Sequence, residues 1–164
     1  DWYAIAKLYS EARQRSLEDL SIVDVRVFNY FSHTQDMNAR FLITDIVRAL
    51  KNNEVFKTSS DNIVRDFVTP PGFYALIQAI IDFKPINTAL DCYTKSPVSK
   101  FDLLSELESK FGLNYEINES IDIINATGSK INYYSTNKIA KDMGYDPINT
   151  SLESVIKEIN FLGL

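Results

Sequence analysis

A tyrosine and a lysine, Tyr3 and Lys7, stand four residues apart near the start of the chain. On a helix, side chains with this spacing lie on one face, with Cβ atoms about 5–6 Å apart. An ammonium group beside a phenol stabilises the phenolate and lowers the tyrosine pKa, which is about 10 in model peptides. Such a tyrosine can act as a general base and take the proton of an alcohol while a hydride leaves the same carbon. An amphipathic helix with an exposed lysine has the same spacing without any chemistry.

The segments that would position this pair read as helix, strand and helix. Residues 2–17 carry apolar side chains at helical spacing and end with Arg13 and Arg15, cations that suit the negative end of the helix dipole. Residues 21–31 are rich in β-branched and aromatic side chains, which is typical of a strand buried on both faces of a parallel sheet. Helical spacing returns over residues 38–52.

The rest of the chain continues the alternation. Apolar runs bounded by turn residues predict further strands at residues 55–57, 63–69, 88–94, 113–118 and 121–124. Helical spacing predicts further helices at residues 73–83, 100–111, 137–143 and 152–162. Ser99 is a good N-cap, Gly112 and Gly144 are helix-ending residues, and Thr150 or Ser151 caps the last helix. This order of elements predicts an α/β architecture.

The most apolar stretch, residues 73–83, follows Pro70-Pro71-Gly72, where a central strand must stop because proline cannot donate to the ladder. It contains Gln78 and Asp82 and is far too short to span a bilayer. We therefore expect a core helix here and no membrane association.

Composition limits the possible functions. The 164 residues are 45% hydrophobic, which suits one packed domain, and the net charge of −5 argues against binding to nucleic acid. Cys92 and His33 are the only cysteine and histidine, so neither a disulfide framework nor a Cys/His zinc site is expected, and no metal is predicted. Cys92 is predicted to be a small buried hydrophobe. A short parallel sheet with several amphipathic helices would leave apolar surface uncovered, so the chain is expected to be part of something larger.

Three blocks occur in order: YAIAKLYSE at 3–11, RVFN at 26–29 and VRDFV at 64–68. Together they resemble the extended short-chain dehydrogenase/reductases, the NAD-dependent nucleotide-sugar epimerases and dehydratases. The MGYDP at 143–147 and the TSLE at 150–153 resemble the end of the same family. The glycine-rich dinucleotide turn of the family does not occur, so the resemblance implies a C-terminal half that is inactive without its N-terminal half.

The resemblance implies the C-terminal part of a Rossmann-type parallel sheet plus a small α/β substrate-binding domain. Residues 1–94 would belong mainly to the dinucleotide-binding domain, with interleaved substrate-domain segments, and residues 95–164 mainly to the substrate-binding domain. The implied partners are a nucleotide sugar and a second copy of the chain, met through residues 2–17, in the cytoplasm. A non-catalytic binding or assembly module that keeps the fold is the alternative.

The resemblance also assigns roles to five residues, with NAD favoured over NADP. Tyr3 would be the acid/base, and Lys7 would bind the nicotinamide ribose and lower the tyrosine pKa. Phe28 would join Tyr3 and Lys7 in contacting the cofactor. Asn29 and Arg65 would contact the substrate diphosphate, for which a guanidinium offers bidentate geometry. The alternatives without a binding role are a polar residue that ends a strand at Asn29 and a surface arginine at Arg65 that pairs with a carboxylate such as that of Asp66.

Departures from the family leave the sugar open. Tyr30-Phe31-Ser32-His33 replaces the usual Gly-Pro or Gly-Ala turn after Asn29, and Pro70-Pro71-Gly72 replaces the usual Val-Asp pair after Val68. His33 either touches substrate or is a solvated loop residue. Tyr133 and Tyr134 either stack in a sugar pocket or pack in the core.

Overall fold

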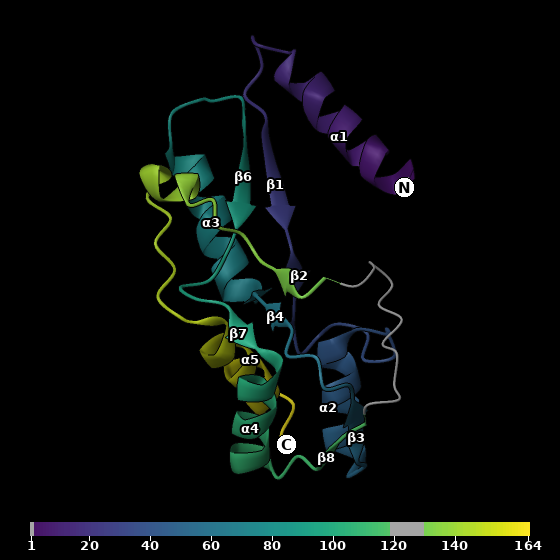
Figure 1. Ribbon diagram of the computed structural model, residues 1–164. Coiled ribbons are helices and arrows are strands. Elements are labelled where there is room, and N and C mark those ends of the chain that lie inside the picture. Colours follow the sequence, from purple (N-terminus) through teal and green to yellow (C-terminus); the bar gives the residue numbers. More distant parts are fainter. Residues whose placement is uncertain (1, 119–129) are drawn as a thin grey trace.

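The computed structural model describes residues 2–118 and 130–164 (Figure 1). The helices are α1 (Trp2–Arg15), α2 (Leu42–Asn52), α3 (Pro70–Asp82), α4 (Lys100–Phe111), the 3-10 helix η1 (Ile139–Met143) and α5 (Ser151–Asn160). The strands are β1 (Val23–Val27), β2 (Asn29–Tyr30), β3 (Phe56–Thr58), β4 (Val64–Arg65), β5 (Phe67–Val68), β6 (Thr88–Cys92), β7 (Val98–Ser99), β8 (Tyr115–Ile117) and β9 (Asn132–Tyr133). The strand predicted at residues 121–124 lies outside the described residues.

The strands form several short, mostly parallel pairings. β1 runs parallel to β6, from Val23 opposite Thr88 to Val27 opposite Cys92. β2 is parallel to β5, and β3 is parallel to β8. β4 lies between β7, which is antiparallel to it, and β9, which is parallel to it. The α/β class predicted from the sequence is confirmed.

Two strands predicted as continuous are interrupted. The run 21–31 breaks at Phe28 into β1 and β2, and the run 63–69 breaks at Asp66 into β4 and β5. At the second break the Asp66 carboxylate is buried and accepts bonds from the Thr94 backbone N–H at 2.9 Å and the Thr94 hydroxyl at 2.5 Å. Because Asp66 is fixed in this way, β4 ends before it and pairs with β7 and β9, while β5 begins after it and pairs with β2. Burial of β1 on both faces was also wrong, because its residues are half-buried or exposed.

The larger apolar core lies among α2, α4 and α5, below the β1–β6 pair in Figure 1. Its buried members are Phe31, Ile43, Ile46, Val47, Phe67, Val98, Leu103, Leu104, Leu107, Leu113, Val155 and Ile159. A second cluster joins the β6 strand to α3 and η1, and its buried members are Val68, Leu76, Leu90, Cys92, Tyr93, Ala140, Met143 and Tyr145. The prediction of a buried Cys92 is confirmed, and burial raises the pKa of its thiol to about 12.

The caps of α4 and α5 are those expected from the sequence. The Ser99 hydroxyl accepts the Asp102 N–H at 3.1 Å, and Gly112 ends α4 with a φ of 71°, a conformation that favours glycine. Thr150 and Glu153 form a reciprocal capping box at the start of α5. Gly144 ends η1 as expected, although that segment is a 3-10 helix.

α2 and α3 begin elsewhere than predicted. α2 begins at Leu42, because the Thr44 hydroxyl accepts the Phe41 N–H at 3.1 Å and fixes the helix start there. α3 begins at Pro70, since Pro70 and Pro71 occupy the first two helical positions, where an N–H has no intrahelical partner. α3 was also predicted as a core helix, but Leu76 is its only buried residue.

α1 differs from the other helices, since none of its residues is buried. In Figure 1 it lies beside the β1–β6 pair, antiparallel to β1, with its N-terminal end level with the arrowhead of β1. Within residues 2–118 and 130–164, no helix has the length and apolar character needed to cross a membrane.

Candidate functional site

Ion pairs between α1 and the neighbouring strand set their register. Arg15 at the end of α1 binds Asp24 at 2.6 Å, and Glu11, one turn earlier, accepts the Arg26 Nε–H at 2.9 Å. A step of four residues along α1 therefore matches a step of two residues along β1. Four helical residues rise about 6 Å and two strand residues rise about 6.6 Å, so the spacing of the charged side chains on α1 matches that on β1.

Continued by the same step, this register would set Lys7 opposite residue 28 and Tyr3 opposite residue 30, past the end of β1 at Val27. In Figure 1 the first turn of α1 lies at about the height of the β1 arrowhead, but the helix slants away from the strand toward its N-terminus. Ligands of open α/β sheets bind at this end of the strands. The ion pairs hold the C-terminal half of α1, at Glu11 and Arg15, against β1.

Tyr3 and Lys7 lie on the same face of α1, as their spacing predicts. The Lys7 ammonium is 5.5 Å from the centroid of the Tyr3 ring, within the range of a cation–π contact. Tyr3 is 71% exposed. The acid/base role of Tyr3 stays a prediction.

Tyr133 on β9 is the point at which the other predicted site residues meet. The Phe28 ring packs edge-on against it, with centroids 5.2 Å apart, and the Asn29 side-chain amide donates to its backbone carbonyl at 3.3 Å. The Arg65 guanidinium carbon lies 6.0 Å from its ring centroid. The structure therefore brings Phe28, Asn29 and Arg65 together around Tyr133. The aromatic pair at 133–134 was the only sequence signal for this centre.

The Arg65 guanidinium is buried among carbonyl groups. Arg65 is 9% exposed and donates to the carbonyls of Val64 at 2.8 Å, Ile131 at 3.1 Å and Lys130 at 2.8 Å. Burial lowers its pKa. The alternative of a surface arginine paired with the Asp66 carboxylate was wrong.

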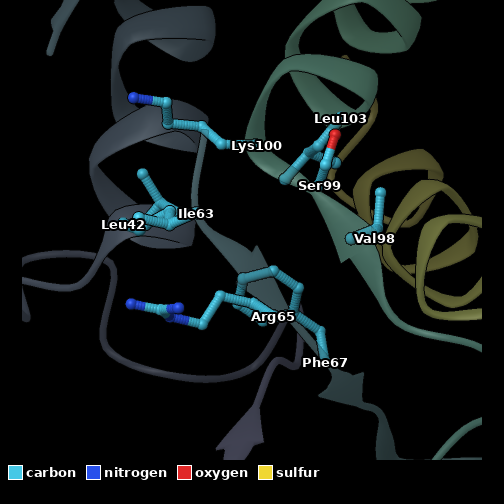
Figure 2. A pocket seen from close by; sticks show the side chains of 8 residues that line it. All are labelled: Leu42, Ile63, Arg65, Phe67, Val98, Ser99, Lys100 and Leu103. Atoms are coloured by element: carbon cyan, nitrogen blue, oxygen red, sulfur yellow. The ribbon is translucent and has the colours of Figure 1, made fainter. Parts of the chain in front are cut away.

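A second buried cation, Lys100, lines the same tight crevice as Arg65, and Figure 2 shows both head groups extending to one side of it, past Leu42 and Ile63. The Lys100 ammonium donates to the Ser59 carbonyl at 2.6 Å, and burial lowers its pKa. Sequence reasoning missed this residue. The available signal was a lysine at the first position of a helix, where the dipole disfavours a cation.

Arg26 joins three elements at the end of the β1–β6 pair. It binds Glu11 of α1 and also donates to the Asp91 carboxylate of β6 at 3.2 Å, and these bonds raise its pKa. Asp91 is buried and also accepts the Ser135 hydroxyl at 2.6 Å. This arrangement ties α1 to both strands. Sequence reasoning assigned Arg26 no function of its own.

His33 is not a solvated loop residue. Its ring Nδ1 lies 2.7 Å from the Glu158 carboxylate on α5, and its backbone N–H donates to the same oxygen at 2.9 Å. These bonds fasten the loop after β2 to α5. In the described parts of the chain, no three His, Cys, Asp or Glu side chains are grouped so that they could hold a metal ion.

Neither a protein-family model nor a curated protein sequence matches this chain. Solved structures do match it. UDP-glucuronic acid 4-epimerase from Bacillus cereus, solved with UDP-glucuronic acid and NAD, superimposes with a TM-score of 0.78 at 16% identity, over 98% of this chain and 52% of the epimerase. UDP-glucose 4-epimerase from Thermotoga maritima superimposes with a TM-score of 0.77 at 16% identity, over 98% of this chain and 53% of the epimerase.

dTDP-glucose 4,6-dehydratase from Bacillus anthracis, solved with NAD, gives a TM-score of 0.71 at 12% identity, over 96% of this chain and 49% of the dehydratase. The chain shares the fold of these enzymes. The resemblance drawn from the three sequence blocks is thereby confirmed at the level of the epimerase fold. The chain spans about half the length of the structures it matches.

Proposed function

We propose that the chain is the C-terminal half of an NAD-dependent nucleotide-sugar epimerase or dehydratase, in which Tyr3 is the acid/base. The observation that supports the proposal is the Tyr3–Lys7 pair on one face of α1, a helix that Glu11 and Arg15 attach to β1. The shared fold supports the same kind of enzyme. Residues 1–94 would then serve mainly the dinucleotide domain and residues 95–164 mainly the substrate domain.

The residues present suit the nicotinamide end of NAD. The Lys7 ammonium could donate hydrogen bonds of the kind that ribose hydroxyls accept, and the Phe28 ring, packed against Tyr133, offers an apolar surface. NAD, when bound, supplies the hydride acceptor. The chain carries only five glycines and no glycine-rich turn, so the pyrophosphate would be held by residues outside it.

In the proposed reaction the Tyr3 phenolate takes the proton of a sugar hydroxyl while the hydride on the same carbon leaves, giving a keto sugar. Lys7 lies on the same face of α1, with its ammonium 5.5 Å from the centroid of the Tyr3 ring. Asn29 and Arg65 hold the diphosphate of the nucleotide, which fixes the sugar relative to Tyr3. Arg65 has five N–H donors, so bonds to the carbonyls of residues 64, 130 and 131 leave donors for a phosphate oxygen.

The test is Tyr3→Phe in the complete protein. Loss of the phenol should lower turnover by about 100- to 10,000-fold, since that is the range attributed to a general acid or base. NAD binding should be largely retained, because the ring and Lys7 remain. Tyr9→Phe is the matched control, as Tyr9 is a second exposed tyrosine of α1. Unchanged turnover in Tyr3→Phe would refute the assignment.

A non-catalytic assembly module is the second candidate. It is favoured by the large apolar side chains that α1 leaves exposed, among them Trp2, Ile5 and Leu8. A panel of UDP- and dTDP-sugars, tested for protection of the complete protein against thermal unfolding, separates the two. Protection by one nucleotide sugar supports the enzyme. Self-association without any protection supports the module.

A further inference from the structure

Bonds to other elements hold the C-terminal half of α1 and the residues after it. The Asn87 side-chain amide donates to the carbonyls of Gln14 at 2.9 Å and Leu17 at 2.7 Å, close to the ion pair that Arg15 makes. Among these attachments, the one at Glu11 lies farthest toward the start of the helix. It therefore has the greatest influence on where the first turn of α1 lies.

The Glu11 attachment fixes an orientation as well as a distance. One Glu11 oxygen accepts the Arg26 Nε–H at 2.9 Å, and the other accepts from Arg26 Nη2, which makes the pair bidentate. On its other side the Arg26 guanidinium donates to the Asp91 carboxylate at 3.2 Å. Because Asp91 is 7% exposed and Arg26 is bound on both sides, the guanidinium has little freedom to turn.

The series of bonds continues into the segment that carries Tyr133. The second oxygen of the Asp91 carboxylate accepts the Ser135 hydroxyl at 2.6 Å, and the Ser135 oxygen accepts the Asn137 backbone N–H at 2.9 Å. Ser135 is buried and lies two residues after Tyr133, the centre of the predicted substrate contacts. The bonds thus link α1 to the segment on which those contacts meet.

The geometry of α1 makes the Glu11 attachment important for Tyr3. An α-helix rises about 1.5 Å per residue, so Tyr3 lies about 12 Å beyond Glu11 and about 18 Å beyond Arg15. In Figure 1 the start of α1 slants away from β1. Without the Glu11 attachment the helix can turn about residues 14–17, and a tilt of about 3° then moves Tyr3 by about 1 Å. A misplacement of this size can lower a catalytic rate about a hundredfold.

We infer that Arg26 is a positioning residue, which holds α1 so that Tyr3 keeps its place relative to the bound substrate. The inference rests on the proposed function, because it requires Tyr3 to act on a substrate. Arg26 acts through Glu11 and does not touch the substrate itself. Partly exposed ion pairs add little to stability, so the loss of Arg26 should affect the rate of reaction far more than the folding of the chain.

The experiment measures kcat and KM of Arg26→Met in the complete protein, with the nucleotide sugar that the wild type turns over. We expect kcat to fall about 10- to 100-fold, because Tyr3 is displaced, and KM to change less than about threefold, because Asn29 and Arg65 are unaltered. Arg13→Met is the matched control, since Arg13 is an exposed arginine on the same helix. It should keep the wild-type kcat.

A double-mutant cycle tests whether Arg26 acts through α1. Glu11→Gln leaves an acceptor for only one of the two bonds and should lower kcat by itself. Combined with Arg26→Met it should lower kcat no further than Arg26→Met alone, since both changes remove the same attachment. Asp91→Asn, a change on β6, should lower both kcat and the fluorescence anisotropy of Trp2. If Arg26→Met does not fold, Glu11→Gln carries the test.

The inference is overturned if turnover depends on Tyr3 but is unchanged in Arg26→Met, or if only KM rises. It is also overturned if the losses in Glu11→Gln and Arg26→Met multiply, or if kcat falls while the Trp2 anisotropy stays constant, since α1 would then not have moved. A wild-type protein that turns over no nucleotide sugar refutes the proposed function and this inference with it. Failure of the inference alone is therefore distinguishable.

Discussion

α4 and α1 are of similar length, 12 and 14 residues, but they are attached to the molecule by different forces. α4 buries Leu103, Leu104 and Leu107 in the larger apolar core. α1 buries nothing and is held by side-chain bonds to β1. Burying a leucine contributes about 1.5–3 kcal/mol, whereas a surface ion pair contributes about 0–1 kcal/mol. Most of the free energy of unfolding therefore comes from the apolar core among α2, α4 and α5. The position of α1 depends instead on its ion pairs with β1.

The largest expected effect comes from one leucine in each helix. Leu104→Ala removes a fully buried side chain and should lower the free energy of unfolding by about 2–5 kcal/mol. Leu8→Ala, at an exposed site on α1, should change it by no more than about 0.5 kcal/mol. Urea unfolding measures both. Equal losses would mean that α1 is as firmly packed as α4.

A smaller effect is expected from Arg26→Met, which removes the link from Glu11 to Asp91. The free energy of unfolding should fall by about 0.5–1.5 kcal/mol, because the bonds are partly exposed. The local effect should be clearer, since Trp2, the only tryptophan, lies on α1 and its fluorescence anisotropy reports the mobility of that helix. The anisotropy should fall.

Arg40→Met is the control for Arg26→Met, because Arg40 is a highly exposed arginine 3.7 Å from Asp45. It should leave the Trp2 anisotropy unchanged. A fall of the same size in both variants would contradict a specific role for Arg26.

The smallest effect expected is a pH dependence of α1. The hydrogen bond from Arg26 holds the pKa of Glu11 below its ordinary value of 4.5. Because the folded pKa is lowered, this contribution to stability is complete above pH 4.5 and is lost as the pH falls through the folded pKa. The Trp2 anisotropy should be constant from neutral pH down to about pH 4.5, and it should decline as the pH falls further through the folded pKa of Glu11. In Glu11→Gln the decline should be smaller, and an identical decline would exclude Glu11 as its source.

Local signals in the sequence predicted the elements best. Ser99, Gly112 and Thr150 act through bonds within a few residues, so the bounds of α4 and the start of α5 followed from residue type. The breaks at Phe28 and Asp66 could not be foreseen, because Asp66 is anchored by Thr94, 28 residues away. The exposure of α3 was also not predicted. Its apolar residues suggested burial, but the sequence does not show which other elements cover them, and Leu76 alone is buried.

The candidate site was predicted in two unequal parts. Tyr3 and Lys7 share a helical turn, so their common face followed from spacing alone. Tyr133 reaches Phe28, Asn29 and Arg65 across more than sixty residues of sequence, and no local pattern encodes that meeting. Lys100 and Glu158 were missed for the same reason, because their partners are Ser59 and His33.

The two prolines that open α3 have a chemical consequence. The first turn of a helix usually presents free amide hydrogens that grip phosphate oxygens. Pro70 and Pro71 carry no such hydrogen, and the Phe73 amide is bonded to the Thr69 carbonyl, which leaves the Gly72 amide alone in that turn. An anion near the carboxyl end of β5 would therefore find few backbone donors at this helix end, and its binding would depend on side chains.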